Sequence, residues 1–157
     1  MYKLSLNHEY KMQDIESLGL STELFKDIEN IECSGYLRMP MIKKELTKIF
    51  SNNGFILKQK LHNEYNIYIT GIKEKVGLCI QMGHKAGWYF DMTKLTYLKK
   101  KGVIDKAVIV LPSKELEKFC KTSSIATYEL IASRQELFGD IFNNESHIMR
   151  LDISRRT

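Results

Sequence analysis

The chain has 157 residues, of which 43% are hydrophobic and 27% are charged. This length fits one domain, and this composition is typical of folded globular proteins, which argues against intrinsic disorder. No run of about 18 apolar residues is present, which argues against a membrane-spanning helix, and the polar start of the chain does not resemble a signal peptide. We therefore expect one domain over residues 1–157, acting in the cytoplasm.

Basic side chains exceed acidic ones, with 24 Lys and Arg against 19 Asp and Glu and a formal net charge of +5. Such an excess attracts polyanions only where the charges cluster, and an ordinary basic surface also explains it. Clusters occur at 43–44, 58–60, 99–101 and 155–156. The three cysteines are widely spaced without a CxxC pair, which predicts free thiols and no structural zinc.

The first half of the chain predicts helices and then strands. Apolar residues at loosely helical spacing, interrupted near Gly19, predict one or two short helices over residues 14–32. Pro40 suits the first turn of a helix that Asn52-Asn53-Gly54 ends. Strands are then predicted at 55–60, 65–70 and 76–82, with a hairpin turn at Gly71 and 73–75 between the last two.

The second half predicts a parallel crossover. Residues 83–87 form a polar loop, Asp91 caps a helix through Lys101, and a buried strand follows at 104–111. Two further helices and a final strand are predicted at 113–121, 127–138 and 147–153. The expected fold class is therefore α/β, with a central mixed sheet flanked by helices.

Residues 76–113 read VGLCIQMGHKAGWYFDMTKLTYLKKKGVIDKAVIVLPS and resemble the BglII family of type II restriction endonucleases, within the PD-(D/E)xK nuclease superfamily. That family has an acidic-x-Gln element on a buried strand, a base-reading loop, a helix opening with Asp-Met or Asp-Leu, and a strand after a Gly-x-Ile turn. The matching segments are Cys79-Ile80-Gln81, Gly83-His84-Lys85, Asp91-Met92 and residues 102–105. Weaker likeness extends to 34–55 and 126–138. The resemblance implies a restriction-endonuclease-like domain, a double-stranded DNA partner and a homodimer.

The resemblance also implies a Mg²⁺ site with two carboxylates, but both positions hold other residues here. Cys79 stands at the acidic position beside Gln81, and Thr70 stands nine residues earlier, where the family has an Asp. The Cys79 thiol, with a reference pKa of about 8.5, is a poor ligand for Mg²⁺, and the Thr70 hydroxyl is neutral. Gln81, Cys79 and Thr70 are thus the implied catalytic positions, with both acids replaced.

Other residues are candidates for the missing roles. Glu74 in the hairpin turn and Glu45 on the preceding helix are possible substitute carboxylates and metal ligands, although solvent exposure explains both. Gly83, His84 and Lys85 are candidates for DNA contact, because glycine permits close approach and the other two donate to phosphates or guanine edges. An ordinary solvent-exposed turn is the alternative for that loop. Trp88 is interpreted as a core residue and Asp91 as a helix cap.

Three functions remain open from the sequence. The first is a double-stranded DNA-binding protein of the type II restriction endonuclease fold that has lost nuclease activity. The second is an active endonuclease that uses Mg²⁺ and a substitute carboxylate, Glu74 or Glu45, to hydrolyse DNA phosphodiesters. The third is an interaction or regulatory protein without a DNA role, which pairs with an active relative.

Overall fold

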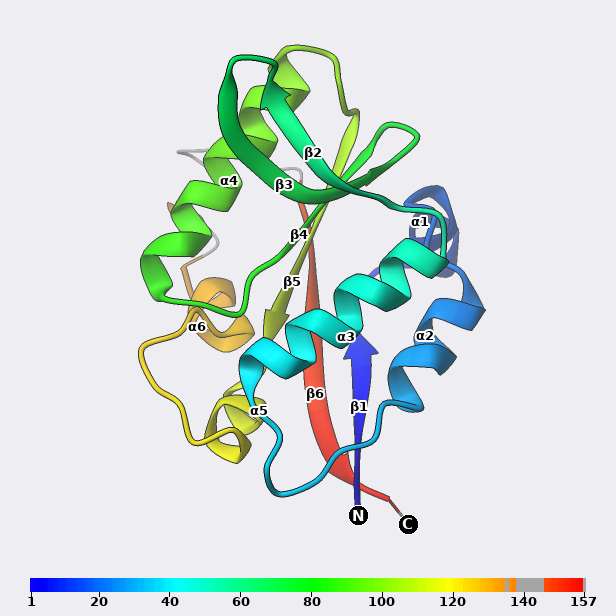
Figure 1. Cartoon of the computed structure of the whole chain (residues 1–157), viewed down its shortest axis with the longest axis vertical. Coiled ribbons are helices and arrows are strands. Elements are labelled where there is room, and N and C mark those ends of the chain that lie inside the picture. The colour runs from blue at the N-terminus through cyan, green and yellow to red at the C-terminus, as the bar shows by residue number, and fades with distance from the viewer. Residues whose placement is uncertain (135, 138–145, 157) are drawn as a thin grey trace.

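The structure is a computed structural model that describes residues 1–134, 136–137 and 146–156. Within these residues, a central sheet has the strand order β1-β6-β5-β4-β3-β2 (Figure 1). β4 pairs with β5 and β5 with β6 in parallel, whereas the other neighbours are antiparallel. The strands are β1 (Tyr2–Asn7), β2 (Ile56–His62), β3 (Tyr65–Lys73), β4 (Val76–Ile80), β5 (Lys106–Pro112) and β6 (His147–Arg155). The predicted mixed sheet is confirmed.

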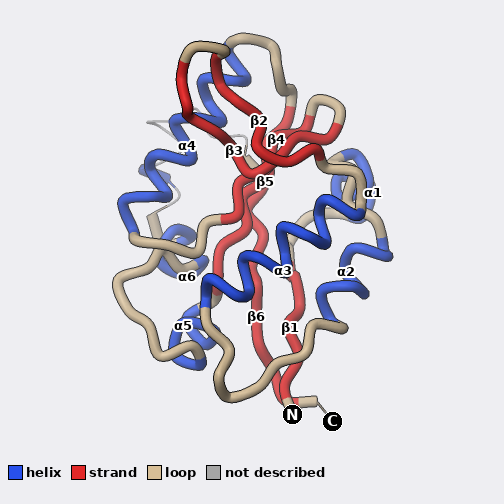
Figure 2. The backbone as a smooth tube through the Cα atoms, viewed as in Figure 1, coloured by secondary structure: helices blue, strands red, loops and turns tan. Residues whose placement is uncertain are grey.

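Helices cover both faces of the sheet, as Figure 2 shows. Side chains of α1, α2, α3 and α5 belong to one hydrophobic cluster, and those of α4 and α6 belong to a second cluster. The helices are α1 (Met12–Ser17), α2 (Thr22–Glu29), α3 (Met39–Asn52), α4 (Lys85–Lys100), α5 (Lys114–Phe119) and α6 (Tyr128–Ala132). No helix in the described part of the chain is long and apolar enough to cross a membrane.

Strand β5 shows why the sheet is buried on both sides. Val108 and Val110 point into the first cluster, whereas Ala107, Ile109 and Leu111 point into the second. Successive side chains of a strand point to opposite faces, so a continuous apolar run supplies both clusters at once. The apolar sequence of β5 therefore places this strand in the middle of the fold.

Several predicted boundaries differ from the structure. The prediction that Asp91 caps a helix is wrong, because α4 begins at Lys85 and Asp91 lies inside it. Gly71 lies within β3 and not in a turn, because β3 continues to Lys73 and the chain reverses at residues 74–75. Strand β1 was not predicted at all. Part of the helix expected at 127–138 lies outside the described residues, and α6 spans its first half.

Candidate nucleic-acid interface

A cleft of about 460 Å³ lies between α3, the β2–β3 hairpin and the first half of α4. The end of β4 forms part of its lining, because the sheet splits between β3 and β4 beyond the Gly71–Leu78 pair. The lining residues are Lys43, Thr47, Leu57, Lys58, Tyr68, Ile69, Thr70, Ile80, Gln81, Gly87, Phe90, Asp91 and Lys94. The cleft therefore contains two of the positions singled out in the sequence, Thr70 and Gln81.

Gln81 is held in one orientation by two hydrogen bonds. Its Nε2 donates to Asp91 Oδ2 at 2.7 Å, and its Oε1 accepts from the backbone N of Gly83 at 2.8 Å. The side chain is buried, with 9% of its surface exposed. Because both ends of the amide are engaged, Gln81 is a fixed part of the cleft wall.

Asp91 is the carboxylate of the cleft. Burial raises the pKa of its carboxyl group, while the charge of Lys94 and the hydrogen bond from Gln81 oppose that rise. Lys94 Nζ lies 3.4 Å from Asp91 Oδ1, and both side chains are largely buried, with 15% and 13% exposed. Lys94 Nζ also lies 4.5 Å from the centre of the Phe90 ring. Each carboxylate oxygen of Asp91 thus already has a partner from the chain.

Gly87 makes room for this arrangement in the first turn of α4. A Cβ atom at this position would lie 2.7 Å from Gln81 Nε2, a distance that real Cβ atoms do not adopt. A larger residue would push the Gln81 amide away from Asp91. The glycine that suggested a loop in the sequence is therefore required by the side chain packed against the helix.

Thr70 and Cys79, the two positions where the resemblance implies acids, have structural roles here. Thr70 Oγ1 accepts a hydrogen bond from the backbone N of Ile80 at 2.9 Å, where the two strands separate. Cys79 is 1% exposed and belongs to the cluster that contains Trp88 and Met92. Burial raises the pKa of the Cys79 thiol, and nearby Asp91 raises it further, so the thiol is neutral at pH 7.

These residues do not fit a Mg²⁺ site. The cation prefers several oxygen ligands that include free carboxylates, whereas the cleft offers Asp91, which is bonded to Lys94 and Gln81. Among the residues that the structure describes, no group of three or more His, Cys, Asp or Glu side chains is arranged to hold a metal ion. No step that depends on a bound metal can therefore be built from this cleft.

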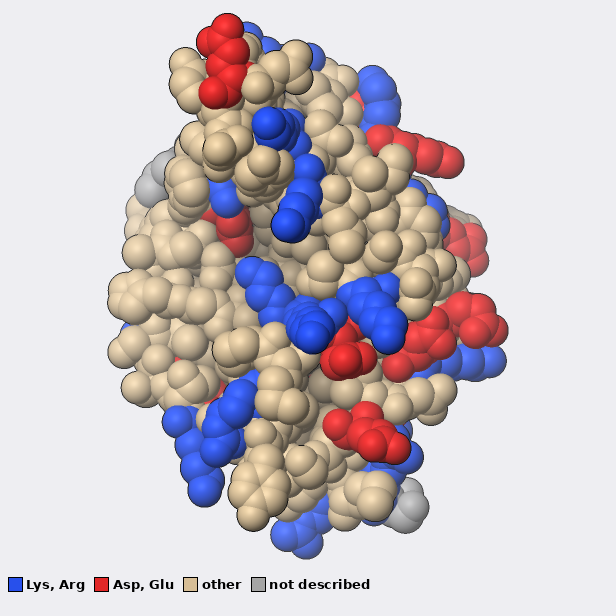
Figure 3. Space-filling view, in the orientation of Figure 1, with Lys and Arg blue, Asp and Glu red and all other residues tan. Residues whose placement is uncertain are grey.

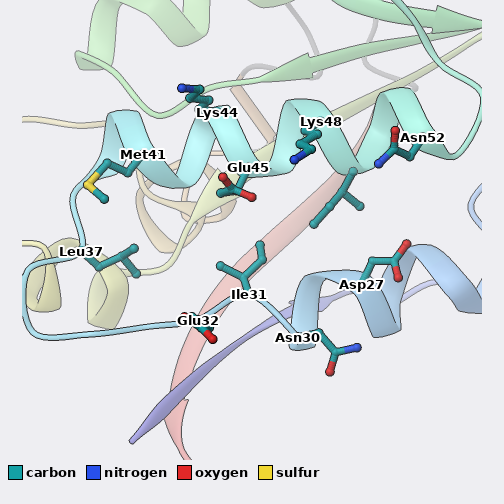
Figure 4. A pocket seen from close by; sticks show the side chains of 11 residues that line it. Asp27, Asn30, Ile31, Glu32, Leu37, Met41, Lys44, Glu45, Lys48 and Asn52 are labelled. Atoms are coloured by element: carbon teal, nitrogen blue, oxygen red, sulfur yellow. The ribbon is translucent and has the colours of Figure 1, made fainter.

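The candidate substitute carboxylates lie elsewhere. Glu74 is exposed in the turn between β3 and β4, with a φ of 53°. Glu45 is exposed on α3 and lines a different cavity of about 610 Å³ between α2 and α3 (Figure 4). In that cavity it lies near Lys48 and Met41 (Figure 4). Neither glutamate is part of the cleft lining.

Lysines from three elements surround the cleft. Lys43 comes from α3, Lys58 from β2 and Lys94 from α4, and the first two are exposed. Figure 3 shows basic side chains gathered over α3, whereas acidic side chains gather toward α2. The cleft therefore presents positive charge to a ligand that approaches this face.

The segment Gly83-His84-Lys85 is exposed but more ordered than a free loop. His84 is the N-cap of α4, and its Nδ1 accepts from the backbone N of Ala86 at 3.2 Å. Lys85 N donates to Ser124 O at 3.1 Å, which ties the segment to the chain before α6. Lys85 thus lies in the first turn of α4, outside the lining of the cleft.

The mixed sheet between two helical layers, with a basic cleft where β3 and β4 separate, matches the restriction-endonuclease fold. The sequence model of the restriction endonuclease BglII/BglIII family matches residues 4–143, so the chain belongs to that family. The crystal structure of restriction endonuclease BglII complexed with a DNA 16-mer is similar, with a TM-score of 0.61 and 10% identity. The match covers 99% of this chain and 79% of that chain. A comparison with curated proteins finds no match.

Sequence reasoning missed the two charged residues of α4 that line the cleft, Asp91 and Lys94. Asp91 had been interpreted as a cap, and Lys94 had no assigned role. A signal was present: Trp88, Met92 and Leu95 are spaced as one buried helical stripe, and all three are buried in the second cluster. Extending that stripe back to Trp88 places Asp91 inside the helix, beside the buried face.

Proposed function

We propose that the chain binds double-stranded DNA through this cleft and does not cleave it by a Mg²⁺-dependent reaction. The observation that carries the proposal is the composition of the cleft: Lys43, Lys58 and Lys94 surround Gln81, while Asp91 is already paired. The similar structure of BglII was solved with DNA, which supports a duplex as the ligand. The charge of the cleft favours binding, and its lack of free carboxylates disfavours hydrolysis.

The expected loss of activity is large. A metal-dependent nuclease needs anionic ligands to hold the ion that polarises the phosphate and activates water. Every 1.36 kcal/mol of lost transition-state stabilisation lowers the rate about tenfold. Replacing two charged ligands by a buried thiol and a bonded hydroxyl removes several kcal/mol, which lowers the rate by about three orders of magnitude or more.

Binding should depend strongly on salt. Each phosphate neutralised by a lysine contributes about −0.9 to the slope of log K against log salt, so three lysines predict a slope of about −2.7. The experiment is a fluorescence anisotropy titration of a labelled duplex at several salt concentrations, with cleavage followed on gels in Mg²⁺ and Mn²⁺. A slope near zero would contradict DNA binding, and strong cutting by the unaltered chain would contradict the loss of nuclease activity.

Restoring the acids tests the origin of the inactivity. The variants Cys79→Glu and Cys79→Glu/Thr70→Asp return carboxylates to the two family positions. If the remaining cleft is still competent, the double variant should cleave duplex DNA in Mg²⁺ or Mn²⁺. Circular dichroism must show that each variant is folded, because Glu at a 1% exposed position carries a burial cost. Inactivity of a folded double variant would contradict a recently disabled nuclease.

The assembly and the setting are inferred by resemblance. Family enzymes act as symmetric dimers on palindromes, so we infer a homodimer, which light scattering after size-exclusion chromatography would test. We infer one domain over residues 1–157, because both hydrophobic clusters pack on the same sheet. Action on DNA fits a cytoplasmic protein.

A further inference from the structure

The Lys94 ammonium lies inside the cleft and not at its rim. Its Nζ is 3.4 Å from Asp91 Oδ1, and 15% of its side chain is exposed. Lys94 follows Asp91 by three residues on α4, so the two side chains lie on the same face of the helix. The helix therefore holds the Lys94 ammonium close to the Asp91 carboxylate.

The Lys94 ammonium also lies against an aromatic ring. Its Nζ lies 4.5 Å from the centre of the Phe90 ring, and Phe90 is 54% exposed. A cation over an aromatic face is attracted by the electrons of the ring, which restricts the rotamers of the lysine. A pre-positioned ammonium loses less conformational entropy when it binds a ligand than a free surface lysine does.

The cleft carries more positive than negative charge. Lys43, Lys58 and Lys94 line it together with Asp91, so three cations face one carboxylate. Electrostatic influence of Lys94 and Lys43 reaches both Asp91 and the Cys79 sulfur. Lys43, Lys58 and Lys94 therefore line the same cleft as Thr70 and Gln81, two of the positions at which the resemblance implies metal-site residues.

An ammonium group can replace one function of a metal ion and not the other. It neutralises a phosphate and donates hydrogen bonds to its oxygens. It does not coordinate a water molecule and lower its pKa, which is the function that cleavage needs. A tethered lysine in this cleft therefore supports binding without hydrolysis.

We propose that Lys94 substitutes for the divalent metal as the cation that binds a backbone phosphate of duplex DNA, with Asp91 as its positioning residue. This inference rests on the proposed function, because it assumes that the duplex enters this cleft. It adds that binding requires no divalent ion, and that the Lys94 charge supplies a defined share of the affinity.

The test compares Lys94→Met with Lys100→Met on the same helix. Methionine keeps the length of the stem and removes the charge, and Lys100 is exposed in the last turn of α4, outside the cleft. Duplex affinity is measured by anisotropy in EDTA and in Mg²⁺ at matched ionic strength. We expect the unaltered chain to bind in EDTA at least as tightly as in Mg²⁺, because the divalent ion competes for the DNA phosphates. We expect Lys94→Met to lose about tenfold and to reduce the salt slope by about 1, whereas Lys100→Met should stay within about twofold.

A second pair of variants covers the case in which Lys94→Met does not fold, since it leaves Asp91 buried without its cation. Asp91→Asn/Lys94→Met removes both charges, and it is compared with Asp91→Asn alone. The same tenfold loss and reduced slope are expected between these two chains. Lys94→Arg, which keeps the charge, should retain most of the affinity.

The outcomes separate this inference from the proposed function. If the unaltered chain fails to bind duplex DNA, both fall. If it binds with a steep salt slope but Lys94→Met matches Lys100→Met, DNA binding stands and the role of Lys94 is overturned. If it binds only when Mg²⁺ is present, the substitution of a lysine for the metal is overturned while DNA binding again stands.

Discussion

Replacing Gly87 by alanine should destabilise the protein, although alanine is the better helix former. Gly87 lies in the first turn of α4, where helix propensity alone predicts that alanine stabilises the fold by up to about 1 kcal/mol. The structure predicts the opposite sign, because the new Cβ would lie 2.7 Å from Gln81 Nε2 and 3.2 Å from Gln81 Cδ. The amide must move, and it is bonded at both ends.

The magnitude follows from the bond that is lost. Gln81 Nε2 donates to the buried carboxylate of Asp91 at 2.7 Å, and hydrogen bonds to charged groups contribute about 1.5–3 kcal/mol. Subtracting the gain in helix propensity leaves a net loss of about 0.5–2 kcal/mol in the free energy of unfolding. The measurement is urea unfolding followed by far-UV circular dichroism.

A double-mutant cycle isolates the clash. In a Gln81→Ala background the amide is absent, so Gly87→Ala should become neutral or stabilising, giving a coupling energy of about 1.5–3 kcal/mol. Gly35→Ala is the matched control, because a Cβ at Gly35 would meet nothing within 4 Å. An equal effect of Gly87→Ala with and without the Gln81 amide, or a stabilised single variant, would refute the reasoning.

Three further outcomes follow from other residues. Burial lowers the pKa of His147 below its ordinary value, so unfolding takes up a proton in acid, and stability should fall below about pH 6.5 more steeply than in His147→Phe, measured by urea midpoints. Ser113 Oγ accepts from Leu116 N at 3.1 Å as the cap of α5, so Ser113→Ala should cost about 1 kcal/mol and exposed Ser123→Ala almost nothing by the same assay. All three cysteines are buried, so a thiol reagent should modify Cys79 only as fast as the chain unfolds, and fast labelling of the native protein would contradict its burial.

The parts of the fold that could be predicted are those where local pattern and tertiary packing agree. The apolar runs of β4 and β5 are short and typical of strands buried on both faces, and α3 has both a helical stripe and Pro40 in its first turn. Strand β1 has a weaker pattern, because only Leu4 and Leu6 are fully buried along it. Its partner β6 lies at the far end of the sequence, which no local pattern can reveal.

In the candidate site, too, some residues could be placed from the sequence and others could not. The position of Gln81 at the end of β4 could be predicted because it follows a recognisable strand. The roles of Asp91 and Lys94 could not, because they depend on where α4 begins. His84, Lys85 and Gly87 all favour a loop by composition, and the helix forms there because Trp88 is fully buried and Gly87 accommodates the Gln81 amide.

The helices on the two sides of the cleft pack on different hydrophobic clusters. Lys43 projects from α3, which rests on one hydrophobic cluster, and Lys94 projects from α4, which rests on the other across the sheet. The distance between these two cations therefore depends on how each helix packs on its own face of the sheet. Shortening a buried side chain such as Leu95 would shift α4 and change the distance between the two lysines. Substitutions at buried sites that no ligand touches can therefore change the affinity for a charged ligand.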